Sequence, residues 1–216
     1  MSSEPARRKA DREQTLLGHE RVLWARGIRS VAGVDEAGRG PLAGPVVAAA
    51  VIMPVDTYIP GVDDSKKLSP LRREELFDVI LRQAAAVGVG VVAHYVVDEI
   101  NILNAALEAM AMAVRDLAVV PEHILVDGNR SLHLGIPCTA IVDGDAMCSA
   151  IAAASIVAKV TRDRLMVEYD REYPGYGFAR HKGYGTRAHR EAIMRLGLCP
   201  IHRRSFAIKP PEEVTP

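Results

Sequence analysis

The chain has 216 residues, 49% of them hydrophobic, and its 27 Lys and Arg residues balance its 27 Asp and Glu residues. This length and apolar content predict one sizeable core and one main domain. No apolar run reaches the roughly 18 residues of a membrane span, and residues 1–26 lack the apolar stretch of a secretory signal. The three cysteines, Cys138, Cys148 and Cys199, form no Cys-x-x-Cys pair, which argues against a disulfide framework or a zinc site. We therefore expect a cytoplasmic protein with reduced thiols and no membrane contact.

The charges are unevenly distributed along the chain. Residues 155–209 contain 12 Lys or Arg and 5 Asp or Glu, a net charge of +7, and the rest of the chain carries −7. A basic C-terminal third opposite an acidic cluster suits an enzyme that holds a polyanion and places metal ions at its reacting phosphate. Long helices with solvated charges would give the same pattern, so the charge alone leaves both interpretations open.

The predicted elements alternate between strands and helices after a polar N-terminal segment. Residues 1–15 are predicted to be mobile, and residues 16–24 to form a short amphipathic helix that packs on the domain. The apolar, β-branched runs predict strands at 30–36, 43–53, 87–97, 123–126 and 139–142. Helices are predicted at 69–86, 98–117, 146–172 and 186–196.

Local signals support these boundaries. A Gly-Arg-Gly-Pro turn joins the first two strands into a hairpin, Ser69-Pro70 is typical of a helix start, and Asp98 is predicted to cap the next helix. The helix at 146–172 begins almost uniformly apolar and becomes charged, so its first half is predicted to lie under the sheet. A hairpin followed by alternating elements predicts an α/β fold with a mixed sheet.

Residues 34–40, Val-Asp-Glu-Ala-Gly-Arg-Gly, place two adjacent carboxylates at the end of an apolar strand. Neighbouring side chains of a strand point to opposite faces, so Asp35 and Glu36 can converge on one ion only where the backbone bends, as Gly38 and Gly40 permit. A buried acidic strand end needs its charge compensated, and a divalent cation does this well. A strand that ends in a solvated acidic turn is the alternative.

Two further strands end in aspartate, at Asp127 and at the pair Asp143 and Asp145. Ligands of α/β folds gather at such strand ends. Converging carboxylates repel one another unless cations lie between them, and two ions about 4 Å apart can clamp both the attacking and the leaving oxygen of a phosphodiester. Oxygen ligands favour Mg²⁺ or Mn²⁺ over zinc.

Several basic and hydroxyl side chains are candidate phosphate contacts. Lys66 and Lys67 follow an acidic turn, and Ser155, Lys159 and Arg162 share one helix face at spacings of four and three residues. A solvated helix face remains the alternative for Arg162. His181, His202 and Arg203 are weaker candidates, because most histidines in such a setting are local hydrogen-bond partners.

In this context the chain resembles ribonuclease HII, the bacterial type 2 ribonuclease H, from about residue 31 to residue 206. The order of the matching segments makes the resemblance specific. They are Gly33-Val-Asp-Glu-Ala-Gly-Arg-Gly-Pro-Leu-Ala-Gly, Asp64-Ser-Lys-Lys-Leu, Asn101-Ile-Leu-Asn, Val126-Asp-Gly-Asn, Gly144-Asp145, Ile151-Ala-Ala-Ala-Ser-Ile-Val-Ala-Lys-Val-Thr-Arg-Asp, His181-Lys-Gly-Tyr-Gly-Thr and His202-Arg-Arg-Ser-Phe.

The resemblance implies an RNase H-like fold with a small helical C-terminal region. It also implies hydrolysis of the RNA strand of RNA–DNA hybrids and cleavage 5′ of single ribonucleotides in duplex DNA, as in ribonucleotide excision repair, by a monomer with two Mg²⁺ or Mn²⁺ ions that leaves 3′-hydroxyl and 5′-phosphate ends. The metal-binding, catalytic carboxylates of the family fall on Asp35, Glu36, Asp127 and Asp145. Asp143 stands where many members have Lys or a neutral residue, and we interpret it as a bystander.

The family's ribonucleotide sensor falls on Gly38, Arg39 and Gly40, with Tyr184 as the tyrosine that senses the ribose. RNA differs from DNA at the 2′-hydroxyl, so a sensor must touch that group, and a glycine-rich turn lets backbone groups approach it. The expected organisation is a mobile N-terminal extension at 1–28, a catalytic domain at 29–209 with a substrate-binding region from about 170, and a tail at 210–216.

Two other functions fit parts of the pattern. A resolvase-like nuclease would keep the carboxylates but would need no glycine turn and no Tyr184. A non-catalytic nucleic-acid-binding module is disfavoured, because acids beside a polyanion weaken binding unless metal is present. A P-loop nucleotide-binding protein is also disfavoured, since no Gly-x-x-x-x-Gly-Lys-Ser/Thr segment occurs.

Overall fold

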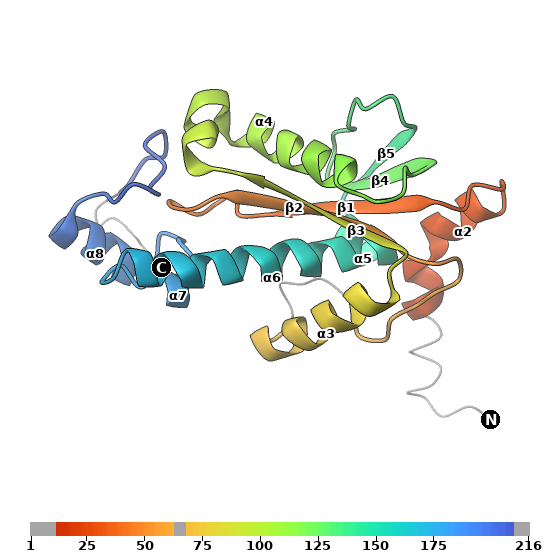
Figure 1. Cartoon of the computed structure of the whole chain (residues 1–216), viewed down its shortest axis with the longest axis horizontal. Helices are drawn as coiled ribbons and strands as arrows, with labels where there is room; N and C mark the ends of the chain where they lie inside the picture. The colour runs from red at the N-terminus through yellow and green to blue at the C-terminus, as the bar shows by residue number, and fades with distance from the viewer. Residues whose placement is uncertain (1–11, 63–67, 210–216) are drawn as a thin grey trace.

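The computed structural model describes residues 12–62 and 68–209, and its centre is one mixed sheet of five strands in the order β3-β2-β1-β4-β5 (Figure 1). The strands pair antiparallel from β1 to β2 and from β2 to β3, and parallel from β1 to β4 and from β4 to β5. The predicted hairpin and mixed sheet are therefore confirmed. The strands are β1 (Val31–Ala37), β2 (Val46–Ile52), β3 (Ala86–Val92), β4 (His123–Asp127) and β5 (Cys138–Ile141).

Helices cover both faces of this sheet. Helix α4 lies on one face and helices α3 and α6 on the other, and the C-terminal half of α6 continues past the sheet to α7 and α8 (Figure 1). The helices are α2 (Gly18–Trp24), α3 (Pro70–Gln83), α4 (His94–Arg115), α5 (Gly144–Met147), α6 (Ser149–Glu172), α7 (Phe178–His181) and α8 (Arg187–Leu196). Among the described residues, no helix is long and apolar enough to cross a membrane.

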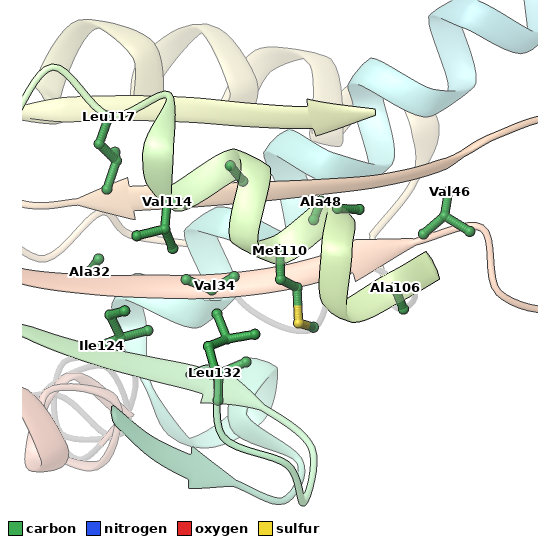
Figure 2. Packing of buried hydrophobic residues seen from close by; sticks show 14 of the residues in the cluster. Ala32, Val34, Val46, Ala48, Ala106, Met110, Val114, Leu117, Ile124 and Leu132 are labelled. Carbon is green, nitrogen blue, oxygen red and sulfur yellow. The ribbon is translucent and has the colours of Figure 1, made fainter. Parts of the chain in front are cut away.

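The core under α4 fixes how β1 and β4 lie beside each other. Val34 of β1 and Ile124 of β4 are fully buried against Met110 and Val114 of α4 (Figure 2). Each such side chain contributes roughly 1.5–3 kcal/mol by leaving water. In the resulting register Val34 pairs with Val126. The residues that follow, Asp35 and Asp127, therefore lie level with each other at the same end of the sheet.

On the opposite face, small residues let α6 approach the sheet closely. The buried first half of α6 is rich in alanine. A Cβ atom on Gly33 of β1 would lie 2.1 Å from the carbonyl carbon of Ala150, so only glycine allows this approach. The close contact holds α6 rigidly against the strand that carries Asp35.

Helix α4 begins earlier than predicted and is kinked. It starts at His94, and Asp98 is not its cap, since the Asp98 carboxylate accepts hydrogen bonds from the backbone N–H groups of Arg204 and Ser205. The kink is at Asn101, whose φ is 66° and whose Oδ1 accepts from the N–H group of Leu103 at 3.0 Å. Asn101 thus caps the second half of the helix, while Asp98 anchors the C-terminal segment.

The predicted helix at 146–172 is broken at Cys148 into α5 and α6, and residue 20 supplies the missing cap. Glu20 of α2 is buried, and its Oε1 accepts from the N–H group of Ala150 at 2.9 Å and from the thiol of Cys148 at 3.3 Å. Burial raises the pKa of Glu20. The predicted packing of residues 16–24 is confirmed. The mobility of the N-terminal extension at 1–28 stays a prediction, although α2 lies within it.

Candidate active site

Three of the four predicted carboxylates converge at the end of the sheet. One oxygen each of Asp35, Glu36 and Asp127 lie within 4.8 Å of one another. Asp35 and Glu36 end β1 and Asp127 ends β4, so the parallel pairing of these strands brings the acids together. The predicted convergence of these three carboxylates is therefore confirmed.

Asp35 carries the strongest electrostatic perturbation of the group. It is 4% exposed. Burial raises its pKa well above the usual value, and the negative charges of Glu36 and Asp127 raise it further. Hydrogen bonds from the hydroxyl of Ser155 and from the N–H group of Glu36, at 2.7 Å from Oδ1, act in the opposite direction. These hydrogen bonds hold the Asp35 carboxylate in place, but they do not balance the burial and the neighbouring negative charges.

Glu36 has a cationic neighbour in the loop that follows β1. Nη1 of Arg39 lies 3.2 Å from Oε1 of Glu36, and the Arg39 side chain is exposed. Burial raises the pKa of Glu36, and the charge and hydrogen bond of Arg39 lower it. Because Arg39 is exposed, this pair contributes little stability and is easily exchanged for another cation.

The remaining aspartates lie around α5. Asp145 is buried in α5, but its carboxylate does not belong to the group that lies within 4.8 Å. The N–H group of Gly144 donates to Oδ1 of Asp127 at 2.7 Å, which ties α5 to the site. Asp143 is exposed at the start of α5 with a φ of 54°. The metal-binding role of Asp145 and the bystander role of Asp143 stay predictions.

The chemistry of the three converging acids fits a divalent cation. All their donor atoms are carboxylate oxygens, which Mg²⁺ and Mn²⁺ prefer. Three like charges in a partly buried site repel one another, and Arg39 is the cation recorded beside Glu36. A divalent ion would remove this repulsion, so the residues present suit the metal that the sequence predicts.

The glycine loop, residues 38–40, and Tyr184 line the same cavity as the carboxylates. The cavity holds about 360 Å³, and its walls include Asp35, Glu36, Ala37, Gly38, Arg39, Gly40, Asp127, Ser155, Lys159 and Tyr184. Tyr184 is 45% exposed, and a Cβ atom on Gly40 would lie 3.5 Å from its Cε1. The two predicted parts of the sensor, the glycine loop and Tyr184, therefore lie next to each other in the wall of the cavity.

The two glycines of this loop have different reasons to be glycine. Gly38 has a φ of 99°, and a Cβ atom there would lie 2.1 Å from Nε of Arg162 and 2.7 Å from the carbonyl oxygen of Pro45. A methyl group on Gly38 would thus point into the protein and not into the cavity. At Gly40 only the ring of Tyr184 is near, so Gly40 is the position that opens toward the cavity.

The predicted phosphate contacts fall into different environments. The Ser155 hydroxyl bonds Asp35, and Nζ of Lys159 lies 2.6 Å from Oδ1 of Asp163. Lys159 and Tyr184 also line a second, larger hollow of about 750 Å³ beside the site. Its walls carry six Lys or Arg residues and three Asp or Glu residues: Arg73, Lys159, Arg164, Arg171, Arg180, Lys182, Glu74, Asp163 and Glu168. Lys66 and Lys67 lie outside the described residues.

Arg162 and Arg203 are not surface contacts. Their exposed fractions are 1% and 0%, and their guanidinium groups donate to backbone carbonyl groups of the loop after β1. His202 is buried too, with its Nε2 atom 3.1 Å from Nε2 of His189, and Nε2 of His181 lies 2.8 Å from the carbonyl oxygen of Tyr176. The candidate phosphate roles of Arg162 and Arg203 are wrong, and the histidines are the local hydrogen-bond partners that were expected.

The sequence argument missed the support that these arginines give to the glycine loop. A basic residue in a basic segment resembles a phosphate ligand. The loop carbonyl groups lie about 120 residues from Arg162 and about 160 residues from Arg203 in the chain. The only sequence signal is glycine at positions 38 and 44, where the structure has left-handed turns that let the loop fold around a side chain.

The chain is similar to known proteins along most of its length. The family model of ribonuclease HII matches residues 32–209. Ribonuclease HII of Geobacter metallireducens is 58% identical over 194 residues, which cover 90% of this chain and 91% of the relative. Ribonuclease HII of Geobacter sulfurreducens is 60% identical over 201 residues, which cover 89% of this chain and 93% of the relative.

Solved structures give the same result for the fold. Ribonuclease H2 of Pyrococcus horikoshii has a TM-score of 0.69 at 31% identity, over 82% of this chain and 93% of that one. RNase HII of Archaeoglobus fulgidus, solved in a complex with PCNA, has a TM-score of 0.70 at 28% identity, over 83% and 96%. The RNase H-like fold is thereby confirmed. The chain belongs to the ribonuclease HII family, the metal-dependent endonucleases of the ribonuclease H type that act on RNA–DNA substrates.

Proposed function

We propose that this ribonuclease H cuts at single ribonucleotides embedded in duplex DNA as well as in longer hybrids. The cut falls on the 5′ side of the ribonucleotide and leaves a 3′-hydroxyl and a 5′-phosphate. One observation carries the proposal: the three crowded carboxylates, the glycine loop and Tyr184 line a single cavity. In such a site, the carboxylates would catalyse hydrolysis, and the glycine loop and Tyr184 would recognise the adjoining sugar.

The carboxylates would hold two divalent ions, Mg²⁺ or Mn²⁺. Asp35, Glu36 and Asp127 supply the ligands that already converge, and Asp145 of α5 is the fourth ligand in this proposal. Two such ions stabilise the charge that develops on the attacking and leaving oxygens of a phosphodiester. Ser155 and the N–H group of Glu36 keep the Asp35 carboxylate in a fixed orientation, and the N–H group of Gly144 does the same for Asp127.

The glycine loop supplies donors for the 2′-hydroxyl. Within the described part of the chain, the backbone N–H groups of Arg39 and Gly40 have no protein acceptor, and both residues are exposed at the cavity. A 2′-hydroxyl can accept such a hydrogen bond and a deoxyribose cannot. Tyr184 presents its ring on the other side of Gly40, where it can stack on the neighbouring sugar or base.

The larger hollow would take the duplex next to the cut. It shares Lys159 and Tyr184 with the catalytic cavity, so a strand can pass from one to the other. Arg164 and Arg171 of α6 and Arg180 of α7 give it a basic wall, which favours phosphate groups. This role agrees with the proposed substrate-binding region from about residue 170 within a catalytic domain at 29–209.

The test compares three duplexes of the same sequence that contain one ribonucleotide, four consecutive ribonucleotides or none. Each is incubated with the protein in Mg²⁺, in Mn²⁺ and in EDTA, and the product ends are identified by their mobility and by phosphatase treatment. We expect metal-dependent cuts 5′ of the ribonucleotide in the first two duplexes, with 3′-hydroxyl and 5′-phosphate ends, and no cut in the third.

Two results would contradict the proposal in different ways. Cleavage of the all-DNA duplex at a similar rate would remove the ribonucleotide sensor and favour a general two-metal nuclease. Products that end in a 2′,3′-cyclic phosphate would mean that the 2′-hydroxyl is the nucleophile, and the metal-assisted hydrolysis would be wrong.

A further inference from the structure

The loop from Gly38 to Pro45 is folded around one buried guanidinium group. Arg203 lies in the segment after α8 and is fully buried. Its Nε donates to the carbonyl oxygen of Gly44 at 3.0 Å, Nη1 donates to those of Arg39 and Pro41, and Nη2 to those of Gly38 and Pro45 at 2.6 and 3.2 Å. All the recorded acceptors of this side chain are therefore main-chain oxygens of one loop.

A second guanidinium group reaches the same loop from α6. Arg162 donates from Nε to the carbonyl oxygen of Pro45 at 2.9 Å, from Nη2 to Ala43 at 3.1 Å, and from Nη1 to Lys182 at 3.0 Å. The two side chains share Pro45 as an acceptor. Arg162 also ties the loop to residue 182, two positions before Tyr184, so one network supports both walls of the proposed sensor.

Neither cation forms a salt bridge among the residues that the structure describes, and their hydrogen bonds go to carbonyl oxygens. The charges of Asp98 and Asp163 act on Arg203 and Arg162 without direct contact. Burial lowers the pKa of Arg203 to about 9 and that of Arg162 to about 10, and both remain charged at neutral pH. A planar guanidinium fork can reach several oxygens at once, whereas an ammonium group offers three donors from one point. The arrangement therefore specifies arginine.

The direction of these bonds decides which loop groups face the cavity. The carbonyl groups of Gly38 and Arg39 point inward to Arg203. The N–H groups of Leu42 and Gly44 donate to the carbonyl oxygens of Gly183 and Ile201. The N–H groups of Arg39 and Gly40 are left without a protein acceptor in the described chain, at the exposed edge of the loop.

We infer that Arg203 is a positioning residue for ribonucleotide recognition: it turns the loop carbonyls inward so that the Arg39 and Gly40 N–H groups are presented before substrate arrives. Arg162 assists by holding the far end of the loop. The inference rests on the proposed function, since it assigns these N–H groups to the 2′-hydroxyl. It gives the C-terminal segment a role in selectivity without any contact with substrate.

The test measures binding preference without cleavage, in an Asp127→Asn background. The dissociation constants of the all-DNA duplex and the single-ribonucleotide duplex are measured, and their ratio is the preference. Adding Arg203→Lys keeps the positive charge but removes the planar guanidinium group that reaches several oxygens at once. We therefore expect the preference to fall at least fivefold, while the affinity for the all-DNA duplex stays within about twofold. Arg204→Lys is the matched control, because Arg204 is adjacent and exposed, and it should leave the preference unchanged.

A purely structural role for Arg203 would lower the melting temperature without changing the preference of the folded protein. An unchanged preference in folded Arg203→Lys would therefore overturn the inference. If the parent itself binds both duplexes equally, the sensor proposal fails, and this inference fails with it. That result appears in the parent and is distinct from a failure in the variant.

A second measurement needs no variant and remains decisive if Arg203→Lys does not fold. Backbone ¹⁵N relaxation of the substrate-free wild-type protein reports the order of the Arg39 and Gly40 amides. A loop positioned in advance should give order parameters near those of rigid backbone, about 0.85. Values below about 0.6 for both amides would show that the loop is not positioned before binding, and would overturn the inference.

Discussion

Two groups of buried charge lie on either side of the glycine loop, and they are built in opposite ways. On one side, Asp35, Glu36 and Asp127 bring like charges together within 4.8 Å, with the exposed Arg39 beside them. On the other side, Arg203 spreads one charge over five main-chain oxygens. The negative charge of the first group is only partly compensated, whereas every N–H direction of the Arg203 guanidinium group is used in a hydrogen bond.

The difference distinguishes a site that needs a cation as ligand from a side chain that supports the structure of such a site. Crowded carboxylates destabilise the fold and persist where a cation neutralises them during function. A cation surrounded by fixed carbonyl dipoles gains nothing from a further ligand and stabilises the chain around it. Removing one charge from each group should therefore have opposite effects on stability, and the following predictions test that contrast.

The largest effect is expected from Asp127→Asn. This change keeps the shape of the side chain and removes one negative charge from the metal site, so cleavage should fall by roughly a thousandfold or more. Substrate binding should survive or improve, and the metal-free protein should be as stable as wild type or more so. Single-turnover cleavage in Mg²⁺ and thermal unfolding in EDTA measure the two effects. Asp143→Asn, at an exposed position, should change cleavage less than about threefold; near wild-type cleavage by Asp127→Asn would show that Asp127 is not a ligand.

The mirror-image change is Arg203→Met. It fills similar space but leaves four carbonyl oxygens without their donor, since only that of Pro45 keeps one, from Arg162. It should therefore lower the free energy of unfolding by about 3–5 kcal/mol. Urea denaturation measures the loss. Arg204→Met, at the exposed neighbouring position, should cost less than about 0.5 kcal/mol. Equal stability of the two variants would mean that the guanidinium network supports nothing.

A third buried group, the pair His189 and His202, should respond to acid. The N–H group of Cys199 donates to Nδ1 of His202, so Nε2 of His202 carries the proton and donates to Nε2 of His189, and Nδ1 of His189 donates to the carbonyl oxygen of Tyr184. Both rings are then neutral. A proton on Nε2 of His189 would face the N–H group of His202 at 3.1 Å. Burial lowers the pKa of His189 from 6.5 to about 4.

Because the unfolded chain binds this proton at a higher pH than the folded one, stability falls as pH drops from 6.5 to about 4. The loss from His189 should reach about 3 kcal/mol at the low end of this window. Urea denaturation at pH 7.5, 6 and 5 should show a smaller loss in His189→Asn than in wild type. His133→Asn, at an exposed position, should follow wild type. Parallel pH curves for wild type and His189→Asn would contradict this account.

The smallest effect is expected from Tyr184, whose ring is exposed and supports no core. Tyr184→Ala should weaken transition-state binding by roughly 1–3 kcal/mol on the single-ribonucleotide duplex, as for other aromatic contacts with nucleic acid. Tyr184→Phe keeps the ring and should lose less. Values of kcat/KM on the three duplexes measure this. Tyr95→Ala, an exposed tyrosine of α4, is the control, and unchanged rate and preference in Tyr184→Ala would place the sensor elsewhere.

Much of the sheet and of the acidic group could be predicted, because both follow from local patterns. Apolar, β-branched runs marked all five strands, and a carboxylate after each of two parallel strands must lie at the same edge. Ser69 followed by proline marked the start of α3, where its side chain accepts from the N–H group of Arg72. These signals lie within a few residues of the feature they predict.

The features that sequence reasoning missed depend on partners far away in the chain. Cys148 breaks the predicted helix because Glu20, 130 residues before Ala150, supplies a cap there. Arg203 resembles a phosphate ligand until the loop around it is known, and Asp98 resembles a helix cap although it binds Ser205. A charged side chain has the same local sequence signature whether it faces solvent, a ligand or a buried carbonyl group.

The most direct test of the central claim, that the crowded carboxylates are a metal site, is thermal unfolding with increasing Mn²⁺. A ligand that binds only the folded state stabilises it by about 2.7 kcal/mol at a hundred times its dissociation constant. We predict that Mn²⁺ raises the melting temperature of wild type, and that Asp127→Asn melts at or above wild type in EDTA and gains much less from Mn²⁺. Equal gains from Mn²⁺ in the two proteins, or an Asp127→Asn protein that melts well below wild type in EDTA, would contradict the account.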